Sequence, residues 1–281
     1  MVKNFMIKKF VLPVTALFMA LIMVTLVQAN DLEQFKGKAG DLRIAGGTAH
    51  IPVVKEAAKR IMTLNPDIRI TIAGGGSGAG IKQVGEGLIH IGNSGRKASD
   101  GEISTHGLAL YRWAIDGVAV VVNPLNTVTA LTRGQLVDIF SGKTTNWKEL
   151  GGKAGQINIY TRDQGSGTRD VFWKKAINKG EIVLSANFVV SNGAMKTAVA
   201  NDPNAIGYMS AGFVDKGLTP VEIDGVTPDD ESIKSGKYTI ARGLYSNTRG
   251  EATGLAKLFV EYLLSDKGQA IVRENGFIPV R

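Results

Sequence analysis

Residues 160–170 read Tyr-Thr-Arg-Asp-Gln-Gly-Ser-Gly-Thr-Arg-Asp, and this stretch carries the densest set of hydrogen-bond donors in the chain. Alternating residues predict a strand over residues 156–161, and the apolar spacing after Thr168 predicts a helix. A Gly-rich turn that opens a helix presents unpaired N–H groups at the positive end of the helix dipole. Arg162, Ser166 and Thr168 add side-chain donors. The turn therefore suits an oxyanion, although the same pattern is also typical of a simple helix N-cap.

The composition excludes several classes of protein. The 281 residues allow one large domain or two medium ones, and they include no cysteine and three histidines. Without cysteine there is no disulfide, thiol catalysis or Cys-ligated zinc, and the histidines lack metal-ligand spacing. We therefore expect no metal site and no cofactor. The lysines are dispersed and no aromatic-basic ladder occurs, which argues against nucleic acid.

Residues 1–29 are predicted to be a secretory signal peptide. Three lysines precede an apolar stretch over residues 10–27, and Val-Gln-Ala before Asn30 resembles a cleavage site. An uncleaved membrane anchor is the alternative, because the apolar stretch is near the minimum length for a span. Removal of the segment lowers the net charge from +8 to +5. A mildly basic exported protein suits an anionic ligand.

Three strands in the first hundred residues each end in a glycine-rich turn. The strands are predicted over residues 41–45, 68–72 and 89–92, and helices follow the first two. Such alternation builds a parallel sheet, in which the turns at the strand C-termini converge on one crevice. Thr48, Ser77 and Ser94 are therefore expected to face one site, together with the turn at residues 162–168.

The remaining elements are predicted from their apolar patterns. The run over residues 113–122 indicates a central buried strand. Further helices are expected over residues 132–140, 194–200, 254–264 and 267–274, further strands over 205–209 and 240–245, and a surface loop over 224–235. The stretch 141–144 lacks the first glycine of a phosphate-binding loop, and 74–79 lacks the acidic residue of a dinucleotide site, so neither predicts a nucleotide.

The four glycine turns, in order, resemble one family. Residues 46–48, 74–82, 91–96 and 162–169 carry its motifs, and residues 138–147 and 266–272 are similar to it as well. The family is that of the periplasmic phosphate-binding proteins of phosphate ABC transporters. The resemblance covers nearly all of the chain after the signal segment, and Arg-x-x-Gly-Ser-Gly-Thr at residues 162–168 is its most specific part.

The resemblance implies an α/β periplasmic-binding-protein-like fold with two lobes, each a mixed sheet flanked by helices, and a ligand in the interlobe cleft. The lobes would comprise residues 30–120 with 244–281, and residues 121–243. The implied partners are inorganic phosphate and an ABC permease with its ATPase, and the implied protein is a periplasmic monomer and not an enzyme. The phosphate contacts carried over by motif fall on Thr48, Ala49, Ser77, Ser94, Gly95, Arg162, Ser166, Gly167 and Thr168.

One position departs from the pattern of many members of the family. An aspartate that accepts the proton of hydrogen phosphate often follows the serine at this place, whereas this chain has Gly95 and other members have serine. Without an acceptor, discrimination of phosphate from sulfate is in doubt. Asp163 could supply an acceptor, or it could pair with Arg162 or Arg169. Arg96 could add a second cation or be a solvated surface residue.

Other functions remain open from the sequence. A receptor for a different tetrahedral oxyanion, such as sulfate, tungstate or arsenate, would need the same donors. A secreted phosphatase or esterase would use Ser77 or Ser166, but neither lies in a Gly-x-Ser-x-Gly elbow and no partner base is evident. A sensor that reports phosphate to a membrane kinase would share the same binding residues.

Overall fold

The computed structural model describes residues 32–281. The predicted signal peptide or membrane anchor at residues 1–29 lies outside the described residues. Within the described part of the chain, no helix combines the length and apolar character that a membrane crossing requires.

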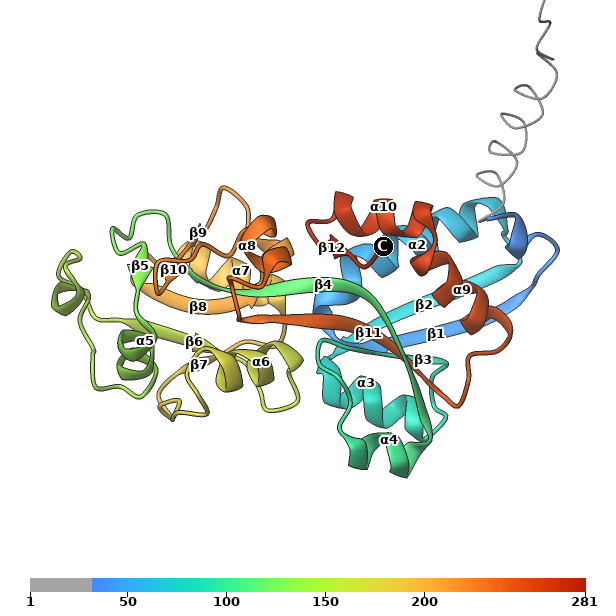
Figure 1. Ribbon diagram of the computed structural model, residues 1–281, viewed down its shortest axis with the longest axis horizontal. Coiled ribbons are helices and arrows are strands. Elements are labelled where there is room, and N and C mark those ends of the chain that lie inside the picture. The colour runs from blue at the N-terminus through green and yellow to red at the C-terminus, as the bar shows by residue number, and fades with distance from the viewer. Residues whose placement is uncertain (1–31) are drawn as a thin grey trace, which may run out of the picture.

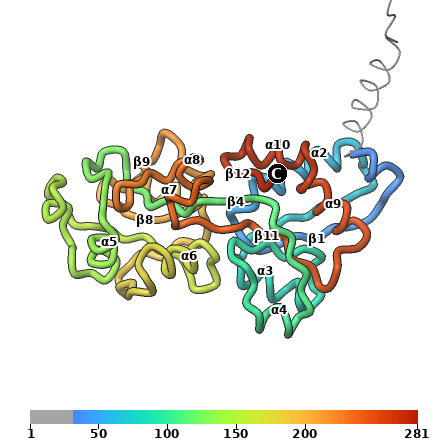
Figure 2. The backbone as a smooth tube through the Cα atoms, in the orientation of Figure 1, coloured from blue at the N-terminus to red at the C-terminus, as the bar shows by residue number. Residues whose placement is uncertain are grey.

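The molecule has two lobes that lie side by side (Figure 1). The first lobe contains three parallel strands, which are β1 (Gly40–Gly46), β2 (Ile68–Gly75) and β3 (Ile91–Ser94). Its helices are η1 (Glu33–Phe35), η2 (Thr48–His50), α2 (Ile51–Leu64), α3 (Gly76–Gly85), α4 (Asp100–His106), α9 (Gly254–Leu264) and α10 (Asp266–Glu274). Figure 2 shows that the two ends of the described chain, in blue and red, lie together in this lobe.

The second lobe is built from the middle of the chain. Its strands are β5 (Ala130–Leu131), β6 (Asn158–Thr161), β7 (Asn187–Phe188), β8 (Ala205–Ser210), β9 (Thr219–Pro220) and β10 (Glu222–Ile223). Its helices are α5 (Arg133–Phe140), η3 (Trp147–Leu150), α6 (Gly167–Lys175), α7 (Asn192–Asn201), η4 (Ala211–Phe213) and α8 (Asp230–Ser235). The short strand β12 (Ile278–Pro279) pairs with β4 near the junction of the lobes.

Two long strands, β4 (Leu108–Val122) and β11 (Ala241–Arg249), connect the lobes (Figure 1). They pair antiparallel with each other, β11 also pairs with β3, and the end of β4 pairs with β8. One continuous sheet results, with the order β2-β1-β3-β11-β4-β8-β6-β7. The resemblance implied a mixed sheet in each lobe, and the structure joins the two through this strand pair.

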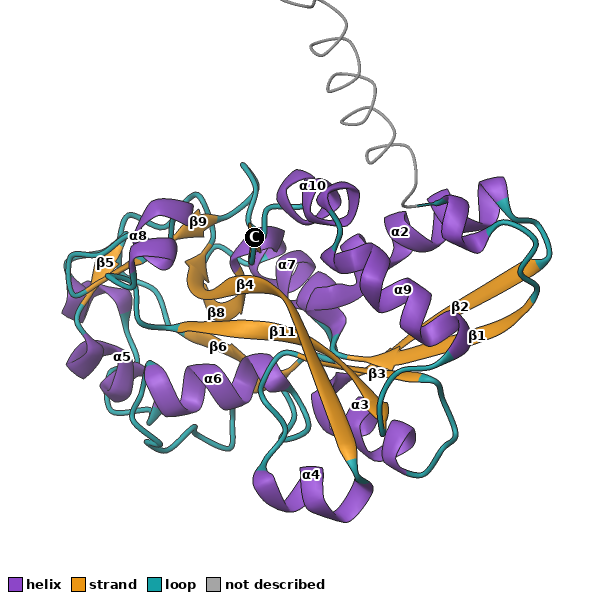
Figure 3. Ribbon diagram, turned by 45° about the vertical axis from the view of Figure 1, so that its right-hand side comes forward, coloured by secondary structure: helices purple, strands orange, loops and turns teal. Residues whose placement is uncertain are grey.

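The end of β4 shows why an unbroken apolar run forms a strand here. Val118, Val120 and Val122 enter one core of the second lobe, whereas Ala119 and Val121 enter a second core on the opposite face, under α7. Because successive side chains of a strand point to opposite faces, a strand covered on both sides must be apolar throughout. In the first lobe, helices likewise cover both faces of the sheet (Figure 3).

The expected elements occur, most of them with shifted ends, and one expected loop contains a helix. Residues 224–235 were expected to form a surface loop, but α8 occupies their second half. The Asp229 side chain accepts a hydrogen bond from the Ser232 N–H, and Gly236 ends the helix in a left-handed conformation. These capping signals identify a helix too short for apolar periodicity to predict. Strand β11 continues beyond residue 245 to Arg249 because it pairs with β4 along its whole length.

Candidate functional site

The turns that follow β1, β2, β3 and β6 converge between the lobes on a small cavity of about 10 Å³. This volume is on the scale of about one water molecule, so the donors around it lie close together. The strands β1, β2 and β3 of the first lobe and β6 of the second lobe run in opposite directions, so their C-terminal ends face each other at the junction of the lobes. The cavity is lined by Gly47, Thr48, Ala49, His50, Gly76, Ser77, Gly95, Arg162, Ser166, Gly167, Thr168 and Arg242.

The structure thus brings together eight of the nine predicted contact residues, and Ser94 is the exception. The Ser94 side chain is fully buried, donates to the carbonyl of Arg96 at 2.8 Å and accepts from Asn247 at 2.9 Å. Its hydroxyl is therefore engaged in holding the turn after β3. Arg96 forms a bidentate ion pair with Glu102, with both oxygens at 2.7 Å, and it does not line the cavity.

Two hydroxyls of the first lobe line the cavity. Thr48 Oγ1 accepts from the backbone N–H and the side-chain amide of Asn192, at 3.3 and 3.2 Å, which ties the first lobe to the second. Ser77 Oγ accepts from the Gly95 N–H at 2.9 Å. Each hydroxyl also carries one hydrogen, and the hydrogens of Thr48 and Ser77 remain available to donate to a ligand.

Two further hydroxyls come from the start of α6. Ser166 is the N-cap of this helix and accepts from the Arg169 N–H at 3.2 Å. Thr168 Oγ1 accepts from Arg242 Nη1 at 3.0 Å. Both side chains are at most 4% exposed, so a ligand that reaches them is shielded from water. A buried anion held by hydroxyls needs such donors for nearly every oxygen.

Helices α3 and α6 begin at the cavity and face each other across the lobes. The N–H of Gly78 donates to the carbonyl of Gly165 at 3.0 Å. A Cβ atom on Gly167 would lie 2.2 Å from Ser77 Oγ, so a side chain there would push the two helix ends apart. The first turns of two helices, with their unpaired N–H groups, therefore converge on one point and favour a negative charge.

Arg162 is a buried cation without an ion-pair partner among residues 32–281. It is 1% exposed, its Nη2 donates to the carbonyl of Val190 at 3.1 Å, and its Nε has no hydrogen-bond partner in the described chain. Burial lowers the pKa of this guanidinium, and the nearby charge of Asp163 opposes the shift. A buried charge left so incompletely compensated is costly unless a ligand completes its contacts.

Arg242 is the functional residue that sequence reasoning missed. It lies on β11 directly opposite Asp116 of β4, and the two side chains form a buried ion pair with Nε and Nη2 at 2.9 and 2.7 Å from the same oxygen. Ser210 also donates to Asp116, at 2.7 Å. Burial raises the pKa of Asp116, whereas Arg242 and Ser210 stabilise its ionised form. The available signal was one acid and one base, each inside an apolar run that predicted a strand, residues 113–122 and 240–245.

His50 lines the cavity but directs its ring nitrogens elsewhere. Nδ1 and Nε2 lie 3.1 Å from the carbonyl oxygens of Gly47 and Ser94, and the ring packs edge-on against Trp113. Burial, assisted by the charge of Arg242, lowers the pKa of His50 to about 3. The ring is therefore neutral near pH 7 and acts as a packing element beside the cavity.

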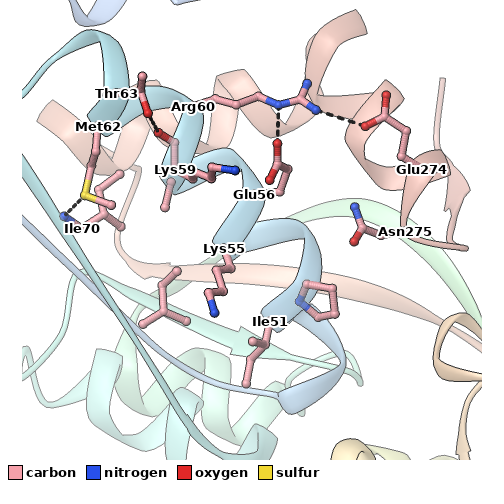
Figure 4. Close-up of a pocket in the computed structure, with 13 residues that line it drawn as sticks. Ile51, Lys55, Glu56, Lys59, Arg60, Met62, Thr63, Ile70, Glu274 and Asn275 are labelled. Atoms are coloured by element: carbon pink, nitrogen blue, oxygen red, sulfur yellow. Dashed lines mark hydrogen bonds and ion pairs between the residues drawn. The ribbon is translucent and has the colours of Figure 1, made fainter.

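A larger hollow lies elsewhere, between α2, β2 and α10, with a volume of about 1020 Å³ (Figure 4). Arg60 in its wall contacts Glu56 at 2.8 Å and Glu274 at 3.1 Å. All of its lining residues belong to the first lobe, and they include the carboxylates of Glu56 and Glu274, which disfavour a further negative charge. The groove is therefore not the candidate anion site.

Two lobes are joined by a strand pair, and donors from both lobes surround the cavity between them. This arrangement defines a solute-binding protein. The family model for the PBP superfamily domain matches residues 34–267. The phosphate-binding protein PstS of Bacillus subtilis is 41% identical over 245 residues, which cover 86% of this chain and 81% of that protein. The PstS of Borreliella burgdorferi is 29% identical, with 85% of this chain and 89% of that protein covered.

Solved structures agree with the sequence comparisons. A substrate-binding protein with bound phosphate from Clostridium perfringens superposes with a TM-score of 0.81 at 34% identity, covering 86% of this chain and 100% of that one. An ABC-type phosphate transport receptor from Vibrio cholerae gives a TM-score of 0.70 at 30% identity, with coverage of 84% and 99%. The chain therefore belongs to the PBP superfamily and, within it, to the family of the phosphate-binding proteins PstS.

Proposed function

We propose that this protein is a receptor that captures inorganic phosphate outside the cytoplasmic membrane and delivers it to an ABC permease and its ATPase. The observation that carries the proposal is Arg162, a buried cation that faces a closed cavity surrounded by hydroxyl and N–H donors. A tetrahedral anion would complete its contacts, because a guanidinium can donate two parallel hydrogen bonds to two oxygens. The relatives named for phosphate binding, and the relative with bound phosphate, support the same ligand.

The ligand contacts in this proposal come from both lobes. The first lobe, residues 30–120 with 244–281, contributes Thr48, Ala49, Ser77 and the Ser94–Gly95 turn. The second lobe, residues 121–243, contributes Arg162, Ser166, Gly167 and Thr168. The boundaries fall within β4 and β11, so bending of these two strands opens and closes the cavity. Donors from both sides on one anion then stabilise the closed arrangement.

We assign no catalytic role to the serines of the site. The oxygens of Ser77 and Ser166 accept from backbone N–H groups, and both nitrogens of His50, the histidine beside the cavity, lie against carbonyls. A nucleophilic serine needs a base within hydrogen-bond reach. The proposed protein is a monomeric receptor of the periplasmic space, exported by a cleaved segment at residues 1–29, with no nucleic-acid partner.

Calorimetry with inorganic phosphate on the purified protein tests the proposal. We expect saturable binding of one phosphate per chain and a melting temperature that climbs with free phosphate, because a ligand that binds the folded state stabilises it by about 2.7 kcal/mol at a hundredfold excess over Kd. Arg60→Gln, in the outer groove, is the matched control and should bind as the parent does. No phosphate heat, together with a melting temperature unchanged up to millimolar phosphate, would refute the proposal.

A receptor for another tetrahedral oxyanion, such as sulfate, tungstate or arsenate, is the second candidate. The observation that favours it is the set of residues around the cavity, which contains no aspartate or glutamate among the described residues. A carboxylate would have to accept the proton that distinguishes hydrogen phosphate from sulfate. Titration with each ion in turn separates this candidate from the first.

A further inference from the structure

Asn192, the first residue of α7, is a buried amide of the second lobe that contacts the first lobe. It is 1% exposed, and its side-chain Nδ2 and its backbone N–H both donate to Thr48 Oγ1, at 3.2 and 3.3 Å. Thr48 follows β1 of the first lobe and lines the cavity. The first N–H groups of a helix have no partner within the helix. A hydroxyl of the opposite lobe provides the partner for this one.

The orientation of the Asn192 amide follows from its second contact. Its Oδ1 accepts from the backbone N–H of Ser210 at 3.0 Å, and a backbone N–H can only donate. Exchange of the amide oxygen and nitrogen would set two N–H donors against each other at this contact. The oxygen of the amide therefore faces Ser210, and its nitrogen faces Thr48.

The Thr48 hydroxyl differs from the other hydroxyls around the cavity. A hydroxyl oxygen has two lone pairs, and Thr48 uses both to accept from Asn192. The oxygens of Ser77, Ser166 and Thr168 each accept one hydrogen bond from the described part of the chain and keep a second lone pair. Thr48 therefore has its hydrogen left, and that hydrogen can donate to an oxygen of the ligand.

The segment that leads into Asn192 also contacts the cation of the site. The carbonyl of Val190 accepts from Arg162 Nη2 at 3.1 Å. Ser191, the next residue, caps α7 by accepting from the Ala194 N–H at 2.9 Å, which fixes the start of the helix. Residues 190–192 thus hold a donor of the second lobe and a donor of the first lobe in one capped turn.

A ligand can enter or leave the cavity only when the lobes move apart. The cavity has a volume of about 10 Å³, and Ser166 and Thr168 in its wall are at most 4% exposed. A bound anion therefore leaves after contacts across the cleft have broken. The two hydrogen bonds from Asn192 to Thr48 are such contacts, because one residue belongs to each lobe.

We propose that Asn192 is a closure latch of the phosphate site: it holds the two lobes together through Thr48 and leaves the Thr48 hydrogen to donate to the anion. Asn192 is a positioning residue in this scheme, because it acts on the ligand through Thr48. The proposal deepens the proposed phosphate-binding function and rests on it. Opening of the lobes exchanges these bonds for bonds to water, so it costs their net strength. The latch therefore slows the release of phosphate and leaves its encounter with the open lobes unaffected.

The experiment compares phosphate kinetics in Asn192→Ala and in the parent protein. Rapid mixing gives the association rate, and release of radiolabelled phosphate into excess unlabelled phosphate gives the dissociation rate. We expect the dissociation rate to rise about fivefold to tenfold and the association rate to stay within about twofold, because the lost bond acts in the closed arrangement. Asn201→Ala, at the exposed end of the same helix, is the matched control and should keep both rates. A dissociation rate in Asn192→Ala within about twofold of the parent rate overturns the inference.

A double-mutant cycle tests whether Asn192 acts through Thr48. Thr48→Ala removes the hydroxyl that accepts both bonds, so adding Asn192→Ala to it should change the phosphate dissociation constant by less than about twofold. Thr48→Ser keeps the oxygen and should preserve the effect of Asn192→Ala. An effect of about fivefold to tenfold that persists in the Thr48→Ala background would assign it to another contact and contradict the latch.

Asn192→Asp covers the case in which Asn192→Ala does not fold. Its carboxylate keeps an acceptor for the Ser210 N–H, so that buried donor stays paired. The carboxylate cannot donate to Thr48 and accepts the Thr48 hydrogen instead, so the dissociation rate should rise at least about tenfold. A parent dissociation rate in this variant contradicts the inference. A parent protein that binds no phosphate refutes the proposed function instead.

Discussion

Two buried arginines line the same cavity and differ in what surrounds their charges. Arg242 lies on a strand, opposite Asp116, and its guanidinium is engaged by a carboxylate, a carbonyl and a hydroxyl. Arg162 lies on a turn, contacts one carbonyl, and has no ion pair with a carboxylate among the described residues. The first charge is compensated within the fold and the second is compensated when a ligand arrives. The ion pair of Arg242 should therefore matter mainly for stability, and Arg162 should matter mainly for ligand binding.

The largest effect on stability is expected at Asp116, because loss of its carboxylate breaks the buried ion pair with Arg242. Asp116→Ala should lower the free energy of unfolding by about 3–5 kcal/mol, because Arg242 is left as a lone buried charge. Urea denaturation of the ligand-free protein measures the change. Asp163→Ala, an exposed acid on the turn beside Arg162, is the matched control and should change stability by about 0.5 kcal/mol or less. Equal losses in the two variants would contradict the idea of a compensated pair.

Arg162→Ala should weaken ligand binding and leave the stability of the ligand-free protein nearly unchanged. Loss of the ligand's charge partner is expected to weaken phosphate binding by about 2–5 kcal/mol, measured by calorimetry. The ligand-free protein should keep its stability to within about 1 kcal/mol, because the Arg162 side chain donates a hydrogen bond to the carbonyl of Val190 and the variant loses that bond. Arg69→Ala, exposed on β2, controls for the loss of a positive charge. Phosphate affinity unchanged in Arg162→Ala would remove this residue from the site.

A smaller effect should appear in the pH dependence of stability through His50. Burial and the neighbouring Arg242 lower its folded-state pKa from 6.5 to about 3. The unfolded chain therefore binds a proton that the folded chain does not, and stability falls as the pH drops below the unfolded value, by about 1.4 kcal/mol per pH unit. Between about pH 6.5 and 4.5 His90, whose pKa is also lowered by burial, contributes in the same direction, whereas Glu102, with a pKa lowered to about 2, begins to contribute below its ordinary value of 4.5.

His50→Gln is the comparison for this measurement. The slope should be smaller in the variant than in the parent protein over the same range of pH, and the difference between the two is the contribution of His50, since His90 contributes to both. A parent protein whose stability is flat from about pH 6.5 to 4.5 would mean that His50 becomes charged in the folded state as readily as in the unfolded chain.

Local patterns were sufficient to predict much of the site. Strand-to-glycine turns place Thr48 and Ser77 at the ends of parallel strands, and the turn at residues 162–168 carries its arginine and hydroxyls within seven positions. Such features are local, because a turn's donors and a helix's first N–H groups depend on neighbours in the chain. Eight of the nine predicted residues line the cavity for this reason. Their contacts with phosphate remain a proposal.

Ser94 and Arg242 show where local reasoning fails. The Ser94 hydroxyl is engaged by Arg96 and by Asn247, and Asn247 lies 153 positions further along the chain. Arg242 and Asp116 are 126 positions apart and meet because β11 pairs antiparallel with β4 in one particular register. A shift of one residue in that register would turn both side chains to the other face of the sheet. Register at this distance is set by packing of the whole sheet, and no short pattern contains it.

The fold class, the strand-end turns and the identity of most donors follow from the order of residues, because periodicity and turn chemistry act over a few positions. The direction in which each donor points follows from contacts between segments far apart in the chain. Gly95 reads in the sequence as a missing acceptor, and in the folded protein it is the space that Arg242 fills. That placement exists once β4 and β11 have paired and the two lobes have packed against each other.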